Sequence, residues 1–138
     1  MTAKPRQDLP ARALRLSIDL LHLQQQTRTS DAMAHIGMQM FRAGSAIGAS
    51  IEEGQVANSR RNMAAKYALA LREARETAYW LKHLAEFPEF TTEARRLEKE
   101  AAEFVAMLTV SVRKLREGQR AREGQRAEGK GQREGQRE

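Results

Sequence analysis

The sequence contains no cysteine, and it is poor in proline and aromatic residues. Its 138 residues include three prolines, and Phe, Trp and Tyr together make up 5%. The absence of cysteine excludes disulfide frameworks, thiol catalysis and cysteine-ligated zinc or iron–sulfur sites. No apolar run is long enough for a signal peptide or a membrane span. We therefore expect a cytoplasmic protein with no membrane association, of a length that supports one domain.

Positive charge is in excess: 24 Lys and Arg stand against 18 Asp and Glu, a net charge of +6. Such a balance favours an acidic partner, and nucleic acid is the first candidate. The segment 116–138 has seven of the cations, five glutamates and five of the nine glycines, and it contains REGQR three times. Because this segment has almost no apolar residue to bury, the sequence predicts a disordered tail there and a flexible N-terminus at 1–8. The tail is either an RNA-binding segment or a plain solubilising extension.

Residues 9–115 have the pattern of an all-α protein, an antiparallel up-down-up-down four-helix bundle. Prolines occur only near predicted helix ends, and no useful period-2 alternation is present. The first helix spans about residues 10–26. Thr29-Ser30-Asp31 supplies cap candidates for the second helix, Asn58-Ser59 can cap the third, and Thr91-Thr92 followed by Glu93 opens the fourth. Apolar residues at 3/4 spacing predict the core: Leu14, Ile18, Leu21; Met33, Ile36, Met40, Ala43, Ile47, Ile51; Tyr67, Leu71, Ala74, Ala78, Leu81, Ala85; Leu97, Ala101, Phe104, Leu108, Val112, Leu115. Gly37, Gly44 and Gly48 share one side of the second helix, where we expect a close approach of another helix.

The third predicted helix is apolar on a second side as well, at Leu69, Trp80 and Leu84. A helix that is apolar on two sides is buried on two sides or exposes a patch. We interpret this face as the interface with another copy of the chain. The alternative is that Trp80 covers the edge of a neighbouring helix.

The same helix has a basic face that could contact phosphates, with a tyrosine ring available for base stacking. Two of its cations, Arg60 and Arg61, lie at the helix start, where the helix dipole disfavours positive charge. The alternative is a solvated face with weak pairs to Glu73 and Glu76. The predicted nucleic-acid-binding residues are Arg60, Arg61, Lys66, Arg72, Arg75, Tyr79 and Lys82.

Motifs for catalysis are missing from the sequence. There is no HExxH, Walker A, GxGxxG or Gly-x-Ser-x-Gly pattern. A dimetal carboxylate bundle needs Glu-x-x-His on two helices, and no Glu here has a His three residues later. We therefore expect no enzyme activity, no cofactor and no metal.

The segment 47–84, IGASIEEGQVANSRRNMAAKYALALREARETAYWLKHL, resembles the four-helix-bundle family of proteins encoded in intervening sequences of bacterial large-subunit ribosomal RNA genes. The resemblance covers about residues 9–115. Met63 and Ala64 depart from it where the family often has an aromatic residue, and the tail at 116–138 is no family feature. Positions that match are Ile47, Gly48, Ile51, Glu52, Glu53, Ser59, Ala70, Leu71, Glu73, Ala74, Arg75, Glu76, Thr77, Tyr79, Trp80 and Leu81.

The resemblance implies a four-helix protomer that assembles into a ring-like homopentamer, without implying an enzyme activity. The third helix, with Tyr79-Trp80-Leu81, is more loosely similar to the accessory proteins of diversity-generating retroelements. Those proteins form pentameric barrels with basic surfaces and bind a reverse transcriptase and nucleic acid. We therefore predict a non-enzymatic homo-oligomer that associates with nucleic acid, RNA first. The alternative is an interaction scaffold for a partner such as a reverse transcriptase.

Overall fold

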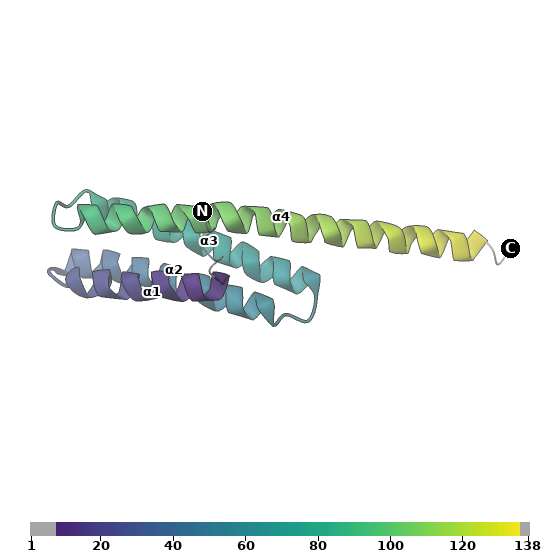
Figure 1. The fold of residues 1–138 in the computed structure, drawn as a ribbon, viewed down its shortest axis with the longest axis horizontal. Helices are drawn as coiled ribbons and strands as arrows, with labels where there is room; N and C mark the ends of the chain where they lie inside the picture. The colour runs from purple at the N-terminus through teal and green to yellow at the C-terminus, as the bar shows by residue number, and fades with distance from the viewer. Residues whose placement is uncertain (1–7, 136–138) are drawn as a thin grey trace, which may run out of the picture.

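The computed structural model describes residues 8–135, and that part of the chain consists of four helices and short connections. The helices run antiparallel beside one another, and α4 is much the longest (Figure 1). The predicted antiparallel four-helix bundle is confirmed. Residues 1–7 and 136–138, part of the predicted flexible N-terminus and tail, lie outside the described residues. The helix bounds are α1 (Leu9–Gln26), α2 (Asp31–Gln55), α3 (Arg60–Ala85) and α4 (Thr91–Gly135).

The helix starts follow from local side-chain chemistry. The Ser30 hydroxyl accepts a hydrogen bond from the backbone N–H of Met33 at 3.2 Å, and the Ser59 hydroxyl accepts one from Asn62 at 3.1 Å. Each serine therefore satisfies one of the backbone donors that a helix start leaves free. Pro10 lies in the first turn of α1, where its missing N–H costs nothing.

Most of the predicted core positions are buried. On α2, α3 and α4 the buried side chains follow the predicted 3/4 spacing, from Met33 to Ile51, from Tyr67 to Leu81 and from Leu97 to Val112. α3 packs extensively against both α2 and α4, whereas α1 packs on α2 and touches α4 only sparsely. The bundle is therefore tightest around α3, the helix with the predicted nucleic-acid-binding residues.

The predicted core face of α1 is wrong. Leu14, Ile18 and Leu21 are 60%, 39% and 39% exposed, and the buried face instead contains Ala13, Leu16, Leu20 and Leu23. Both leucine-rich sets have the 4-then-3 spacing of a helix stripe, so periodicity alone does not distinguish them. The choice depends on what lies opposite, because Ala13 and Leu20 fit against glycines of α2.

The close approach predicted at the glycines of α2 is confirmed. A Cβ atom at Gly44 would overlap the side chain of Leu20, and one at Gly37 would overlap Thr27. Gly48 is less crowded, because its Cβ would lie 3.3 Å from that of Ala13. The lack of a side chain at Gly37 and Gly44 therefore sets how closely α1 and α2 pack.

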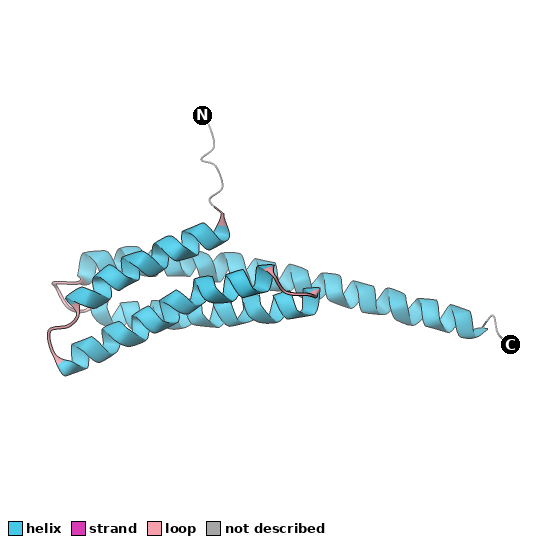
Figure 2. Ribbon diagram, turned by 90° about the horizontal axis from the view of Figure 1, so that it is seen from below, coloured by secondary structure: helices cyan, strands magenta, loops and turns pink. Residues whose placement is uncertain are grey.

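The chain from 116 to 135 continues α4 as a helix, where the sequence predicts a disordered tail. Figure 2 shows this part of α4 extending beyond the other three helices. Arg, Glu, Gln and Ala in this stretch are good helix formers and can extend a helix already formed in the bundle, while its glycines weaken the helix. The side chain of Gln119 also donates to Glu123 one turn later, at 3.1 Å. The last buried side chain is Val112, so the bundle core ends before this extension.

Candidate nucleic-acid interface

Five of the seven predicted nucleic-acid-binding residues lie along one exposed line of α3. Their spacing of 11, 3, 4 and 3 residues keeps them on one side of the helix over about 32 Å at 1.5 Å per residue. All five are exposed, and the ring of Tyr79 is 55% exposed. The five are Arg61, Arg72, Arg75, Tyr79 and Lys82.

The other two predicted residues lie off this line. Lys66 is half-buried on the side of α3 that faces α2, where its Nζ pairs with the Glu53 carboxylate at 2.7 Å. Arg60 is exposed and extends toward α4, where its guanidinium lies against Gly118. The structure thus groups Arg60 with α4 and places Lys66 off the exposed line, in an ion pair with Glu53.

An open cavity of about 410 Å³ lies between α3 and α4, near the C-terminal end of α3. α3 lines it with Arg75, Ala78, Tyr79 and Lys82, and α4 lines it with Glu98, Ala102 and Val105. Three of its lining residues are apolar, Ala78, Ala102 and Val105, and three are charged, the two cations and Glu98. The predicted basic line therefore borders a recess between two helices.

Three exposed arginines of α4 extend the same side of the structure toward the start of α3. Glu98, Ala102 and Val105 continue at 3/4 spacing through Thr109 to Arg113, Arg116 and Arg120. Because α3 and α4 are antiparallel, these arginines lie at the end where Arg60 meets Gly118. We use the name basic groove for the whole set of residues, of which the end at Arg75, Tyr79 and Lys82 borders the recess. The set is Arg60, Arg61, Arg72, Arg75, Tyr79 and Lys82 of α3 and Arg113, Arg116 and Arg120 of α4.

The sequence analysis gave Arg113 no role and assigned Arg116 and Arg120 to a disordered tail at 116–138. The run RKLR at 113–116, which crosses into that segment, is the signal that could have found them. Its two arginines are three residues apart, which places them on one helix face if the helix continues.

Two glutamates of α3, Glu73 and Glu76, lie close in sequence to the cations of the basic groove. The indole N–H of Trp80 donates to Glu76 at 3.3 Å. The pKa of the Glu73 carboxyl is raised, mainly by burial and then by the charge of Glu76, while Arg72 lowers it. Within residues 8–135 no ion pair shorter than 4.0 Å joins either glutamate to Arg72 or Arg75. The arginines on this side of α3 are therefore exposed without an ionic partner among these two glutamates, and both interpretations of this face, a phosphate-binding surface and a solvated one, remain proposals.

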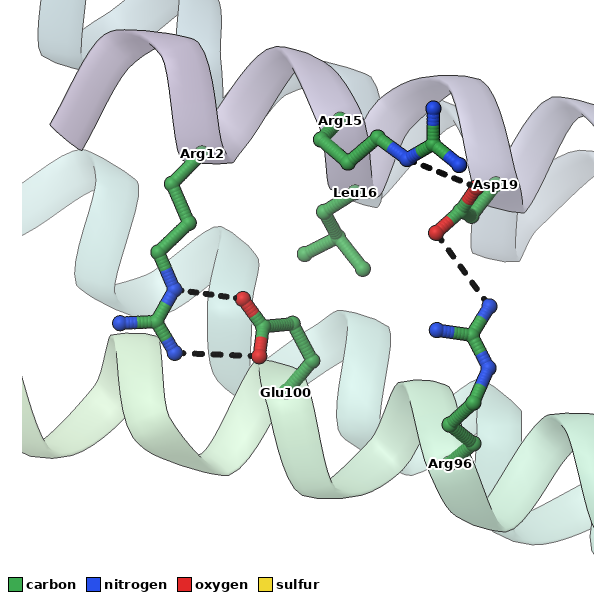
Figure 3. A pocket seen from close by; sticks show the side chains of 6 residues that line it. All are labelled: Arg12, Arg15, Leu16, Asp19, Arg96 and Glu100. Carbon is green, nitrogen blue, oxygen red and sulfur yellow. Dashed lines mark hydrogen bonds and ion pairs between the residues drawn. The ribbon is translucent and has the colours of Figure 1, made fainter. Parts of the chain in front are cut away.

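The seam between α1 and α4 shows the opposite arrangement, with arginines neutralised by acids (Figure 3). Arg12 pairs with both oxygens of Glu100, at 2.6 and 3.0 Å, and also with Glu103. Arg96 donates to Asp19 at 3.2 Å and to Glu93, and these hydrogen bonds raise its pKa. A second cavity of about 410 Å³ lies among these side chains. Its cations are already paired, so this seam links two helices rather than offering free positive charge.

The predicted oligomer interface is only partly available. Leu84 is completely buried in the protomer core, which corrects its assignment to an outer face. It lies three residues after the buried Leu81, and such a pair shares one helix side. Leu69 and Trp80 remain half-buried. Exposed apolar side chains cluster instead on α1, where Leu14, Ile18 and Leu21 lie close together in sequence.

Among residues 8–135 no three His, Asp or Glu side chains gather as a metal site would require. In the same part of the chain, no helix combines the length and the apolar character needed to cross a membrane.

Comparisons with known proteins agree with this architecture. The family model "23S rRNA-intervening sequence protein" matches residues 7–110. A crystal structure of a protein of unknown function from the S23 ribosomal protein family of Bacteroides thetaiotaomicron superimposes with a TM-score of 0.70 at 25% identity. It covers 76% of this chain and 98% of its own. No curated protein matches the chain. The chain belongs to the 23S rRNA-intervening sequence protein family.

Proposed function

We propose that this protein is a non-enzymatic nucleic-acid-binding protein that contacts phosphates through the basic groove. The observation that carries the proposal is the set of exposed cations on two adjacent helices with no ion pair among the described residues. Unpaired surface cations on a low-dielectric scaffold attract a polyanion and release its counterions on binding. At the α1–α4 seam the arginines are paired with acids, so unpaired positive charge is concentrated on the α3–α4 side of the bundle.

RNA is the form of nucleic acid proposed first. The matching family is named for an intervening sequence of 23S rRNA, which links its genes to an RNA-coding locus. The exposed Tyr79 ring between Arg75 and Lys82 offers a surface on which an unpaired base can stack.

Binding to a fluorescein-labelled single-stranded RNA, measured by anisotropy between about 50 and 200 mM salt, tests the proposal. The double variant Arg72→Glu/Arg75→Glu should weaken binding by at least about tenfold and reduce the salt slope by about 1.4, since each single-strand phosphate contact contributes about 0.7. Arg28→Glu is the matched control, because Arg28 is exposed in the α1–α2 connection, outside the groove. Equal effects of the control and the double variant would refute the assignment of the groove.

We also propose that the protomers assemble, with a pentamer as the expected form. Two apolar surfaces stay partly open in the protomer: Leu69 with Trp80 on α3, and the α1 stripe of Leu14, Ile18 and Leu21. The α1 stripe is the more exposed of the two. Burial of such a surface is the driving force for association.

Native mass spectrometry tests assembly, with 15.6 kDa per chain as the unit. The wild type should appear at five times this mass. Leu14→Gln/Ile18→Gln should yield folded monomers if the α1 stripe is the interface, and Leu69→Gln/Trp80→Gln should do so if the α3 surface is. A monomeric wild type would refute the assembly, and a pentamer unaffected by both variants would refute both interfaces.

A protein scaffold, with a partner such as a reverse transcriptase, is the second candidate. The observation that favours it is the same exposed α1 stripe, which belongs to a helix that contributes no residue to the basic groove. Protein purified at low salt without nuclease separates the two functions. Nuclease-sensitive extra mass supports nucleic-acid binding, whereas a clean assembly that captures a reverse transcriptase and no RNA supports the scaffold.

A further inference from the structure

Glu98 is out of place in a phosphate-binding surface. It is the one carboxylate among the residues that line the α3–α4 cavity, where Arg75 and Lys82 are the cations. Within the described part of the chain it forms no ion pair with either of them. A carboxylate repels phosphate, so a role in a nucleic-acid site requires it to meet a hydrogen-bond donor of the nucleotide, and only bases and hydroxyls have donors.

The cavity beside Glu98 has the features of a base site. The walls formed by Ala78, Ala102 and Val105 are apolar, and the ring of Tyr79 borders the same space. The ring of Tyr79 contacts two neighbouring rings: its centroid lies 4.7 Å from that of His83 and 5.2 Å from that of Trp80, both in edge-to-face geometry. A ring that is fixed by its neighbours and still 55% exposed makes a stacking surface at low entropic cost.

The chemistry of a carboxylate selects among the four bases. Guanine has two adjacent donors on its Watson–Crick edge, N1–H and the N2 amino group, which match the two acceptor oxygens of Glu98. Adenine and cytosine place a ring-nitrogen acceptor next to their single amino donor. Uracil places carbonyl acceptors on both sides of its one N–H. In each of these three bases an acceptor would face the carboxylate and be repelled.

We propose that the Tyr79 end of the basic groove binds an unpaired guanine, which stacks on Tyr79 and donates N1–H and N2–H to Glu98, while Arg75 and Lys82 contact the flanking phosphates. The proposal rests on nucleic-acid binding by the groove and adds base specificity to it. A paired guanine has its Watson–Crick edge occupied, so the site selects single strands.

Labelled RNA heptamers of uridine with one central substitution, guanosine, inosine or adenosine, test the proposal by anisotropy at low salt. The guanosine heptamer should bind about tenfold more tightly than the adenosine heptamer, since a bidentate base contact is worth about this factor. Inosine lacks the N2 amino group and should fall between them. Glu98→Gln should abolish the guanosine preference, because the amide N–H₂ of the glutamine would face a donor of guanine. Binding of a heptamer of uridine alone, the reference probe, should stay equal or improve.

Glu89→Gln is the matched control, an exposed glutamate of the α3–α4 connection, and should retain the full preference. Equal binding of all heptamers with no effect of Glu98→Gln would overturn the guanine site and leave the phosphate groove standing, provided that binding stays salt-dependent. No binding of any heptamer at low salt would overturn the groove itself. Tyr79→Ala should weaken binding of every heptamer by at least about fivefold through lost stacking, and an unchanged affinity would remove Tyr79 from the site.

Discussion

Two leucines of α1, two residues apart, should lose very different amounts of unfolding free energy on the same substitution. Leu16 is 2% exposed and Leu14 is 60% exposed. Leu→Ala changes helix propensity equally at both positions, so the difference between the variants reports burial alone. A buried leucine replaced by alanine costs about 3 kcal/mol through lost transfer energy and the cavity left behind. The exposed leucine should cost less than about 0.5 kcal/mol.

Urea unfolding followed by far-UV circular dichroism measures both values by linear extrapolation. A domain of this size has an unfolding free energy of about 5–15 kcal/mol, so Leu16→Ala should remain folded in buffer. Each variant is measured at two protein concentrations, because a loss in Leu14→Ala that grows with concentration would report assembly rather than the protomer core.

If Leu14→Ala lost more unfolding free energy than Leu16→Ala at both protein concentrations, the assignment of the buried face of α1 would be refuted. Such a result would place the core on the stripe of Leu14, Ile18 and Leu21 that the sequence predicts. It would also remove the exposed surface on which the proposed α1 interface depends.

Three further predictions concern packing, pH and the extension of α4. Gly44→Ala should lower the unfolding free energy by about 1–3 kcal/mol, because the new Cβ overlaps Leu20, whereas Gly48→Ala should be near neutral in the same urea assay. Glu73→Gln should stabilise the protein at pH 7: the raised pKa of Glu73 means that its neutral form favours folding at low pH and that this stability is lost as pH rises. The gain in unfolding free energy should vanish in urea titrations at a pH below the ordinary carboxyl pKa. A gain that does not depend on pH would show that the charge of Glu73 is not its cause. Deleting 121–138 should change the unfolding free energy by less than about 0.5 kcal/mol, since the described side chains of α4 beyond Arg120 are almost all exposed, and a larger loss would show that they pack on the bundle.

The sequence by itself determined the helices and their starts. Serines at the caps, prolines near helix ends and apolar spacing of three and four are local signals, and local chemistry acts the same way in any fold. The buried faces of α2 and α4 were also readable, because most of their predicted apolar positions are buried. On α3, which is apolar on two sides, the prediction was right for Tyr67, Ala74 and Leu81, while Leu71, Ala78 and Ala85 are half-buried. Most of the basic line on α3 was predictable for the same reason: helical spacing places residues such as Arg72, Arg75 and Tyr79 together.

The tertiary structure decided what depends on neighbouring helices. α1 has two equivalent apolar stripes, and the contacts of Ala13 with Gly48 and of Leu20 with Gly44 select the buried one. Leu84 is buried by the bundle although the sequence placed it on an outer face. The ionic partner of a side chain on another helix is likewise invisible in the sequence. Only the structure shows that Lys66 pairs with Glu53 and that Glu98 shares a cavity with Tyr79. The helical course of α4 likewise adds its arginines to the groove.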